Sequence, residues 1–311
     1  MNMKRLLGML SIIGMGLLVI TACSEGDEAD PFQLSGAELS AIEAAGFSSD
    51  GAYKSEDGSI WIENDINLTY DQLRNMNPGG IVNEQYGTDF LVDVGSGNRV
   101  ISVWLEVESS GGGGGGNGNG RGNPNRTSSA AFPDVYSLAL DDAIGRFNGE
   151  NLEITFVRAT SSNADIVISR LNKRDERRGV LGSAGFPTSS GDPYGSILMS
   201  GVLQSSYGLG ADGIATILAH EMGHCIGFRH TDYFNRAISC GGSPSNEGDG
   251  GIGDNHVPGT PTGADLQGNG SWMLACTDGS NRPFTNGDKT ALSCLYDNLD
   301  PCAGYAGGIN L

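Results

Sequence analysis

The sequence predicts an α+β protein in which a twisted, mixed β-sheet packs against a long helix. Two observations support this fold class. After residue 98, apolar patterns of strand and helix type follow one another in the order strand, helix, strand, strand, strand, helix, and a further helical pattern lies near the C-terminus. Before residue 98, short helix and hairpin patterns predict a small α+β module that precedes the larger domain.

Composition limits the classes of partner. The chain has 311 residues, 50 of them glycine, and 38% are hydrophobic, which is typical of a loop-rich globular protein. Its formal net charge is -19, whereas proteins that bind nucleic acids need a basic surface. We therefore expect no nucleic-acid partner, and we expect a monomer.

The N-terminus has the pattern of an export signal. Lys4 and Arg5 precede an apolar run, residues 6–20, that is short for a membrane span. Cys23 follows Thr-Ala, as in the bacterial lipobox, whose cysteine is lipidated and becomes the mature N-terminus. We expect a lipoprotein at the outer membrane or cell surface, anchored through Cys23; simple secretion with an incidental Cys23 is the alternative.

Four regions are expected along the chain. They are a signal peptide (1–22), an acidic tether (23–34), a small module or pro-region (35–97), and the main domain (98–311) with a Gly/Asn-rich insertion (110–129).

The elements of the module follow from local patterns. Ser35 and Glu38 have the spacing of a capping box at the start of a helix that stops near Gly46. Residues 52–64 predict a hairpin turning at Asp57-Gly58. Thr69 and Gln72 are spaced to cap a second short helix. The sequence does not decide whether this module supports the domain or is removed.

In the main domain, residues 90–107 predict a hairpin. Its second strand alternates and places Ile101, Val103, Leu105 and Val107 on one face. A helix begins at Pro133, strands follow at 152–157, 165–169 and 195–200, and Asp212 caps a long helix. The charged run 170–178 is interpreted as a solvated loop, and residues 241–270 as mostly loop. Asp288 begins the last helix.

The long helix carries the motif HExxHxxGxxH, residues 220–230. His220 and His224 lie four apart, on one face of a helix, and neutral imidazole suits Zn²⁺. Gly227 can take positive φ and end the helix, so that His230 arrives from outside it as a third ligand. Three protein ligands leave a position for water, and Glu221 is placed to take that water's proton. The motif predicts one catalytic zinc ion.

Other residues are weaker candidates. His256 is expected to be a loop or pocket residue, and acids near Asp249 and Asp254 offer only weak support for Ca²⁺. Five cysteines remain after Cys23, an odd number. Cys240 with Cys276 is our first pairing, which spacing alone cannot establish, and Cys225 is expected to be a small core residue.

These residues together resemble the metzincin clan of zinc metallopeptidases, and most closely the dual-action HEIGH metallopeptidases. The resemblance covers roughly residues 99–311. It includes the motif continuing into Thr231-Asp232, the segments 182–187 and 256–261, and Ser271-Trp272-Met273, which matches the Met-turn below the metal. It favours an insertion at 111–125 over an interdomain linker. No tyrosine follows Met273 closely, where some metzincins have one, and the role of Asp232 stays open between an orienting hydrogen bond and loop packing.

The resemblance implies a zincin-like domain with His220, His224 and His230 as zinc ligands, Glu221 as general base and Met273 in the Met-turn. It also implies that a substrate strand lies antiparallel to an exposed edge strand near 195–200. We therefore expect a zinc-dependent endopeptidase that hydrolyses extracellular proteins through a zinc-bound water. The alternative is a surface-binding lipoprotein that keeps the fold without the chemistry; the intact Glu221 disfavours it.

Overall fold

The computed structural model describes residues 32–45, 47–75, 86–105, 131–248, 254–261, 263–297 and 302–307. The described residues belong to one compact unit, and residues 1–31 lie outside the described part of the chain. The predicted signal peptide, Cys23, Gly46 and the Gly/Asn-rich insertion also lie outside them. No helix in the described part of the chain has the length and apolar character needed to cross a membrane.

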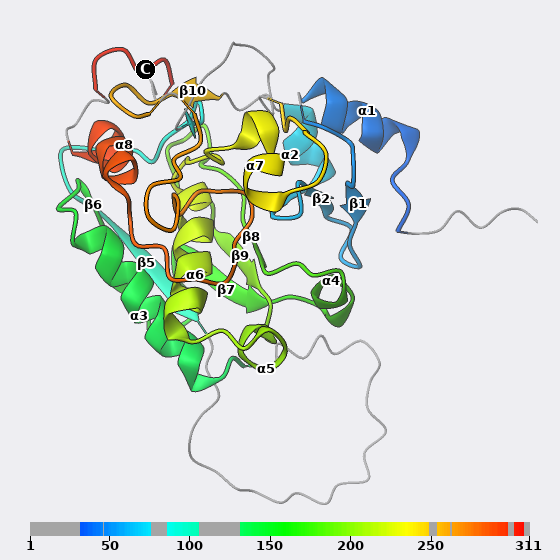
Figure 1. Cartoon of the computed structure of the whole chain (residues 1–311), viewed down its shortest axis with the longest axis horizontal. Coiled ribbons are helices and arrows are strands. Elements are labelled where there is room, and N and C mark those ends of the chain that lie inside the picture. Colours follow the sequence, from blue (N-terminus) through cyan, green and yellow to red (C-terminus); the bar gives the residue numbers. More distant parts are fainter. Residues whose placement is uncertain are drawn as a thin grey trace, which may run out of the picture. The chain divides into compact units, whose positions relative to one another are not determined.

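The elements are labelled as in Figure 1. The helices are α1 (Gly36–Ala44), α2 (Tyr70–Asn75), α3 (Asp134–Asn148), α4 (Lys173–Arg177), α5 (Leu203–Tyr207), α6 (Ala211–Cys225), α7 (Ala237–Cys240) and α8 (Asn286–Tyr296), with a 3-10 turn, η1 (Tyr233–Asn235). The strands are β1 (Tyr53–Lys54), β2 (Ile60–Ile62), β3 (Ile66–Leu68), β4 (Tyr86–Gly87), β5 (Arg99–Leu105), β6 (Ile154–Arg158), β7 (Ile166–Arg170), β8 (Gly182–Ser183), β9 (Ser196–Met199) and β10 (Asn255–His256).

A five-stranded mixed sheet forms the centre of the fold, in the order β6-β5-β7-β9-β8. Its first four strands are parallel, and β8 is antiparallel to β9. Helix α3 packs against β6 and α6, and α6 also contacts β8 and β9 (Figure 1). Apolar residues of the sheet and of both helices share one core. The predicted α+β class with a mixed sheet and a long helix against it is confirmed.

The predicted hairpin at residues 90–107 is wrong. Residues 90–98 contain no strand, and β5 has parallel partners, β6 and β7, on both sides. Leu91 and Val92 are nevertheless buried in the main core, and the Tyr296 hydroxyl accepts a hydrogen bond from the Val92 amide. The apolar residues of this stretch therefore reach the core without forming a strand. The alternation in β5 is confirmed, since Ile101, Val103 and Leu105 are all buried.

Two further expectations for this sheet need correction. The edge strand near residues 195–200 is β9, which lies between β7 and β8, so the edge on this side is β8. The charged run is not a solvated loop, because Asn172 caps the short helix α4 and Asp175 and Glu176 within it are buried. Glu176 pairs with Arg170 at 3.0 Å, and Asp175 accepts a hydrogen bond from the Ser55 hydroxyl at 2.8 Å.

The N-terminal segment, defined here as residues 32–75, has a small core of its own around Ile42, Ile60 and Leu68. The Ser35–Glu38 capping box, the hairpin of β1 and β2 and the second short helix are confirmed. A third strand, β3, was missed and pairs with β2. The domain boundary at residue 97 stays a prediction.

Two disulfides occur among the described residues. Cys240–Cys276, the predicted pair, joins α7 to the chain just after Met273, and Cys294–Cys302 ties α8 to the segment that follows it. The second pair was not predicted. Cys225 is free and fully buried, in agreement with its expected place in the core.

Candidate metal centre

Helix α6 brings two of the predicted ligands to one place. Ile214, Leu218 and Met222 are fully buried in the main core, which fixes the rotation of the helix. His220 and His224 are one turn apart, and their ring centroids are 4.7 Å from each other. The helix therefore directs both imidazoles to the same side.

Gly227 ends the helix as the motif predicts. Its φ is 104°, a conformation that glycine adopts readily and other residues rarely. A Cβ at this position would lie 2.9 Å from Leu91 Cδ2 and 3.1 Å from the Phe90 carbonyl oxygen, so the backbone also passes too close for a side chain. The reversal brings His230 back toward α6.

The three imidazoles converge. His220 Nε2 lies 3.2 Å from His230 Nε2, and the ring centroids of His224 and His230 are 4.9 Å apart. Tetrahedral zinc with Zn–N bonds near 2.0–2.1 Å requires ligand atoms separated by roughly 3.3 Å. One ligand atom from each histidine and one Asp65 oxygen lie within 4.8 Å of one another. This spacing fits a single zinc ion.

Outer hydrogen bonds hold each ring by its other nitrogen. His220 Nδ1 lies 2.8 Å from the Trp272 carbonyl oxygen, and His224 Nδ1 lies 2.8 Å from the Phe228 carbonyl oxygen. His230 Nδ1 lies 2.8 Å from Glu247 Oε1. Because these oxygens can only accept from Nδ1–H, each Nε2 is left with a lone pair for a metal.

Burial favours the neutral imidazole that a metal needs. It lowers the pKa of His220 to about 4, and with the two neighbouring rings it lowers the pKa of His224 well below its usual value. For His230, burial also lowers the pKa, but the carboxylates of Asp65 and Glu247 outweigh it and raise the pKa well above normal. Within the described residues, the buried His224 Nε2 has no hydrogen-bond partner, which is consistent with a metal ligand.

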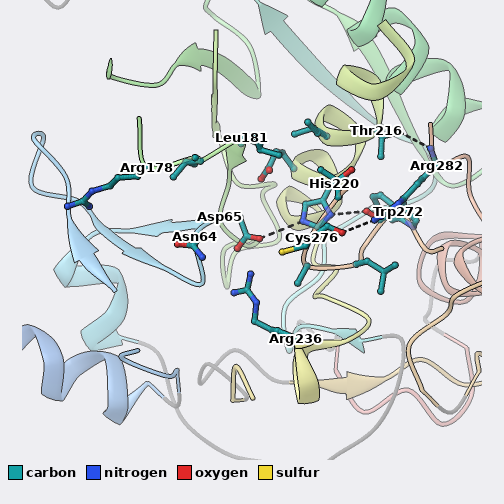
Figure 2. A pocket seen from close by; sticks show the side chains of 18 residues that line it. Asn64, Asp65, Arg178, Leu181, Thr216, His220, Arg236, Trp272, Cys276 and Arg282 are labelled. Carbon is teal, nitrogen blue, oxygen red and sulfur yellow. Dashed lines mark hydrogen bonds and ion pairs between the residues drawn. The ribbon is translucent and has the colours of Figure 1, made fainter. Parts of the chain in front are cut away.

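Glu221 lines the same pocket as His220, a cavity of about 250 Å³ (Figure 2). Burial and the nearby Asp65 raise the pKa of its carboxyl well above the usual value. A Cβ on Gly182 would lie 2.4 Å from Glu221 Oε1, so the edge strand β8 approaches this carboxylate at a position without a side chain. The predicted general base thus faces the cavity beside the histidines.

The segment around Met273 forms a turn that packs against α6 at the metal centre. Met273 is fully buried, and Leu274 N donates to the Ser271 carbonyl oxygen at 3.3 Å, which closes a turn. A Cβ on Gly223 would lie 2.3 Å from the Trp272 ring and 2.7 Å from Met273 Sδ. Gly223 therefore allows α6 to pack directly on the turn, and the Trp272 carbonyl holds His220.

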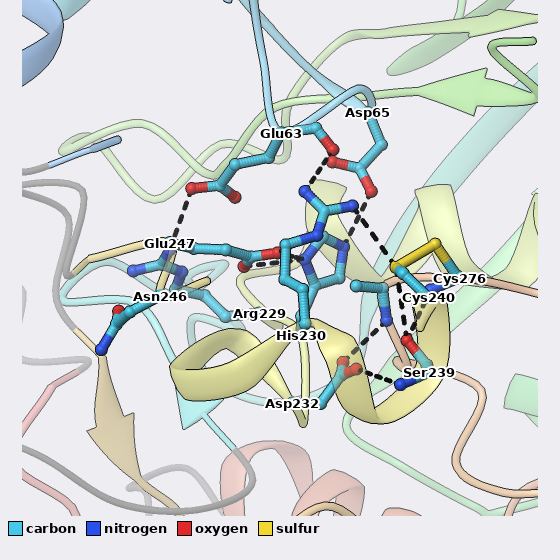
Figure 3. Close-up of polar contacts among 12 residues, drawn as sticks. Glu63, Asp65, Arg229, His230, Asp232, Ser239, Cys240, Asn246, Glu247 and Cys276 are labelled. Carbon is cyan, nitrogen blue, oxygen red and sulfur yellow. Dashed lines mark hydrogen bonds and ion pairs between the residues drawn. A yellow bond between two sulfur atoms is a disulfide. The ribbon is translucent and has the colours of Figure 1, made fainter. Parts of the chain in front are cut away.

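Asp232 makes structural hydrogen bonds. Its two oxygens accept from the Ser239 amide at 3.1 Å and the Ala275 amide at 2.9 Å (Figure 3). These contacts tie the chain after His230 to the chain after Met273. Of the two roles left open, loop packing is the one observed.

His256 belongs to β10 and lies 3.2 Å from the Thr260 hydroxyl; it is in neither group of candidate metal ligands among the described residues. Asp254 is buried and likewise in neither group, and Asp249 lies outside the described residues. Nothing in this part of the chain adds support for Ca²⁺.

Two acidic residues of the centre were missed by sequence reasoning. Asp65 Oδ2 lies 2.9 Å from His230 Nε2 and 4.0 Å from His220 Nε2, and Glu247 contacts the other side of the His230 ring (Figure 3). Neither residue belongs to the motif: Asp65 precedes it by more than 150 residues, and Glu247 follows it in a loop. The positive φ of Glu63 and Asn64 marks the turn at Asp65 as unusual, but sequence does not show this.

Comparison with protein families identifies the family of this chain. The model of the dual-action HEIGH metallopeptidase family matches residues 121–296, more than half of the chain. Comparison with curated proteins finds no significant match.

Solved structures show a distant similarity. A structure of myroilysin, at 15% identity and a TM-score of 0.35, covers 64% of this chain and 93% of its own. High choriolytic enzyme 1, a hatching enzyme zinc-protease from the medaka fish Oryzias latipes, has 16% identity and a TM-score of 0.33, with 66% of this chain and 92% of its own covered. The family match, together with the histidine cluster, shows that this chain belongs to the dual-action HEIGH metallopeptidases and is a zinc-dependent peptide hydrolase.

Proposed function

We propose that the protein is a zinc endopeptidase in which His220, His224 and His230 hold the metal and Glu221 is the general base. The observation that carries this proposal is the convergence of the three histidines, one of which, His220, lines the same pocket as Glu221. Zinc, when bound, supplies a Lewis acid that polarises the scissile carbonyl and lowers the pKa of water.

The chain's own residues then manage the protons. Glu221 accepts a proton from the attacking water and later delivers it to the nitrogen of the leaving amine. Burial raises the pKa of this carboxyl, the direction that favours its role as the acid in the second transfer. Trp272 and Phe228 carbonyls and Glu247 keep the three rings oriented throughout.

An extended peptide substrate fits the edge of the sheet. Strand β8 is the edge beside Glu221, so main-chain pairing there places a scissile bond next to the carboxylate. The proposed substrate-pairing strand is therefore β8 and not β9, because β9 has partner strands on both sides.

The Glu221→Ala variant tests the mechanism. It should bind one zinc ion as the wild type does but hydrolyse a peptide about 10²–10⁴-fold more slowly, the range that general acid–base catalysis contributes. Zinc content is measured by atomic absorption and hydrolysis with a fluorogenic peptide library, after any inhibitory segment has been released. Asp134→Ala, which removes an exposed carboxylate of the main domain, is the matched control. Unchanged turnover in zinc-loaded Glu221→Ala would refute the mechanism.

The site of action follows from the N-terminus. The proposed enzyme is exported, lipidated at Cys23 and displayed at the outer membrane or cell surface, where it cleaves extracellular proteins. The basic start, apolar run and Thr-Ala-Cys sequence support this, and two disulfides are compatible with an oxidising compartment.

Replacing Cys23 by serine tests the anchor. In bacteria fed labelled palmitate, the wild-type protein should incorporate the label and stay with the membrane fraction, and Cys23→Ser should do neither. Protease treatment of intact cells then reports surface display. Equal membrane association of the two proteins would exclude the lipid anchor, and full protection of the wild type would exclude display.

A further inference from the structure

Asp65 reaches the metal centre from the N-terminal segment. It follows Glu63 and Asn64, which lie in the tight connection between β2 and β3 and have positive φ values of 60° and 70°. Figure 2 shows its side chain pointing across the pocket toward His220. The Asp65 side chain is 11% exposed, and within the described residues Oδ1 is buried without a hydrogen-bond partner. A buried carboxylate of this kind requires a positively charged partner.

The position of the carboxylate is that of a metal ligand. Asp65 Oδ2 lies 2.9 Å from His230 Nε2 and 4.0 Å from His220 Nε2, two separations that bracket the roughly 3.3 Å between neighbouring ligand atoms of tetrahedral zinc. One ligand atom from each histidine and one from Asp65 lie within 4.8 Å of one another, which gives the four donors that a tetrahedral zinc site needs. Carboxylate oxygen is an ordinary zinc ligand, and four protein ligands make a closed site.

The loop that carries Asp65 and the strand that follows it also form main-chain hydrogen bonds with the edge of the sheet. The Ala184 amide donates to the Asp65 carbonyl oxygen at 2.9 Å, and the Asn67 amide donates to the Ala184 carbonyl oxygen at 3.0 Å. Ile66 bridges Ala184 in the parallel direction. These main-chain groups directly follow β8, where a substrate peptide would pair. A substrate cannot use them while the loop is in place.

Side-chain contacts fasten the loop on both sides. Arg236 Nη1 donates to the Glu63 carbonyl oxygen at 2.6 Å, and the Tyr194 hydroxyl donates to the Asn67 carbonyl oxygen at 3.0 Å. Phe186 belongs to the small core of the N-terminal segment and also packs edge-on against His224 at 5.3 Å. Phe186 therefore packs both against the core of the N-terminal segment and against a histidine of the metal centre.

We propose that Asp65 is the fourth protein ligand of the zinc and that the β2–β3 loop inhibits the peptidase from within its own chain. The proposal rests on the proposed function for its consequence, inhibition, but not for the coordination itself. Asp65 takes the position that an attacking water needs, and the loop occupies the substrate edge. A short peptide then requires only that the metal position filled by Asp65 become free, whereas an extended substrate also requires that the loop leave the edge of the sheet.

Ligand access to the metal tests the coordination without any hydrolysis. The full chain carrying Glu221→Ala, which should be inactive, and the same chain with Asp65→Ala added are loaded with Co²⁺ and titrated with acetohydroxamate by visible absorption. If Asp65 fills the fourth position more than nine-tenths of the time, its removal should tighten acetohydroxamate binding at least about tenfold. Asp71→Ala, an exposed carboxylate of the same segment, should have no effect.

Equal acetohydroxamate affinity in the two proteins, each with one Co²⁺ bound, would overturn the proposal. Asp65→Asn, which keeps the side-chain size, is measured beside Asp65→Ala and should shift the affinity in the same direction, so a folding defect of the alanine variant does not decide the result.

Hydrolysis separates this inference from the proposed function. With Glu221 intact, Asp65→Ala should cleave a short peptide at least about tenfold faster than the full-length wild type. Tighter acetohydroxamate binding without hydrolysis by any variant would leave the Asp65 ligand intact and refute the endopeptidase. Hydrolysis by the full-length wild type that Asp65→Ala does not accelerate, with unchanged acetohydroxamate binding, would refute the inhibitor alone.

Discussion

At the scale of single residues, the third histidine depends on a partner outside the motif. His230 lies beyond the end of α6, so the helix does not fix its ring as it fixes those of His220 and His224. Glu247 provides the missing constraint, because both of its oxygens lie within hydrogen-bond distance of His230 Nδ1, at 2.8 and 2.9 Å. Although burial raises the pKa of Glu247, His230 and Arg236 lower it to about 2, so the carboxylate stays ionised.

Removing this carboxylate should weaken zinc binding. We expect Glu247→Ala to lower zinc affinity about 10–100-fold, the effect typical of outer hydrogen-bond partners of metal ligands. Glu247→Gln should lose less, since its amide oxygen can still accept from Nδ1–H. Affinity is measured by competition with a chromophoric chelator, with Glu56→Ala as the surface control. An affinity in Glu247→Ala equal to that of the wild type would show that the helix break alone positions His230.

At the scale of elements, local patterns predicted the parts of the chain whose structure depends on nearby residues. The Ser35–Glu38 capping box, the hairpin of β1 and β2 and the glycine break at Gly227 all involve residues within a few positions of one another, and all are confirmed. The three zinc-ligand candidates converge for the same reason. The motif encodes both the helical spacing and the reversal that follows it.

Pairing between distant segments could not be predicted in this way. The alternation in β5 correctly identifies a strand with one buried face, but it does not say that both neighbours are parallel and come from later in the chain. The positions of β9 and β8 in the sheet likewise depend on the path of the chain between distant segments and not on the residues of either strand. Asp65 and Glu247 reach the histidines by such long-range placement, so spacing gave no indication of them.

At the scale of the whole molecule, the two walls of the metal centre come from separate stretches of chain. One wall follows His230 and includes α7; the other follows Met273. Asp232 joins them through hydrogen bonds to Ser239 and Ala275, and the Cys240–Cys276 disulfide joins them covalently (Figure 3). The disulfide closes a loop of 36 residues, so it restricts the unfolded chain considerably.

This cross-link should therefore contribute more to the free energy of unfolding than the second one. Chain-entropy reasoning gives about 4 kcal/mol for Cys240–Cys276 and about 2.5 kcal/mol for Cys294–Cys302, whose sequence separation is 8. We expect Cys240→Ser with Cys276→Ser to lower the unfolding midpoint in urea more than Cys294→Ser with Cys302→Ser does, at saturating zinc. The first double variant should still bind one zinc ion, because Asp232 continues to hold the two walls together. A larger drop in the urea midpoint for Cys294→Ser with Cys302→Ser would contradict the chain-entropy argument. Loss of zinc from Cys240→Ser with Cys276→Ser would mean that the Cys240–Cys276 disulfide acts on the folded metal centre and not mainly on the unfolded chain.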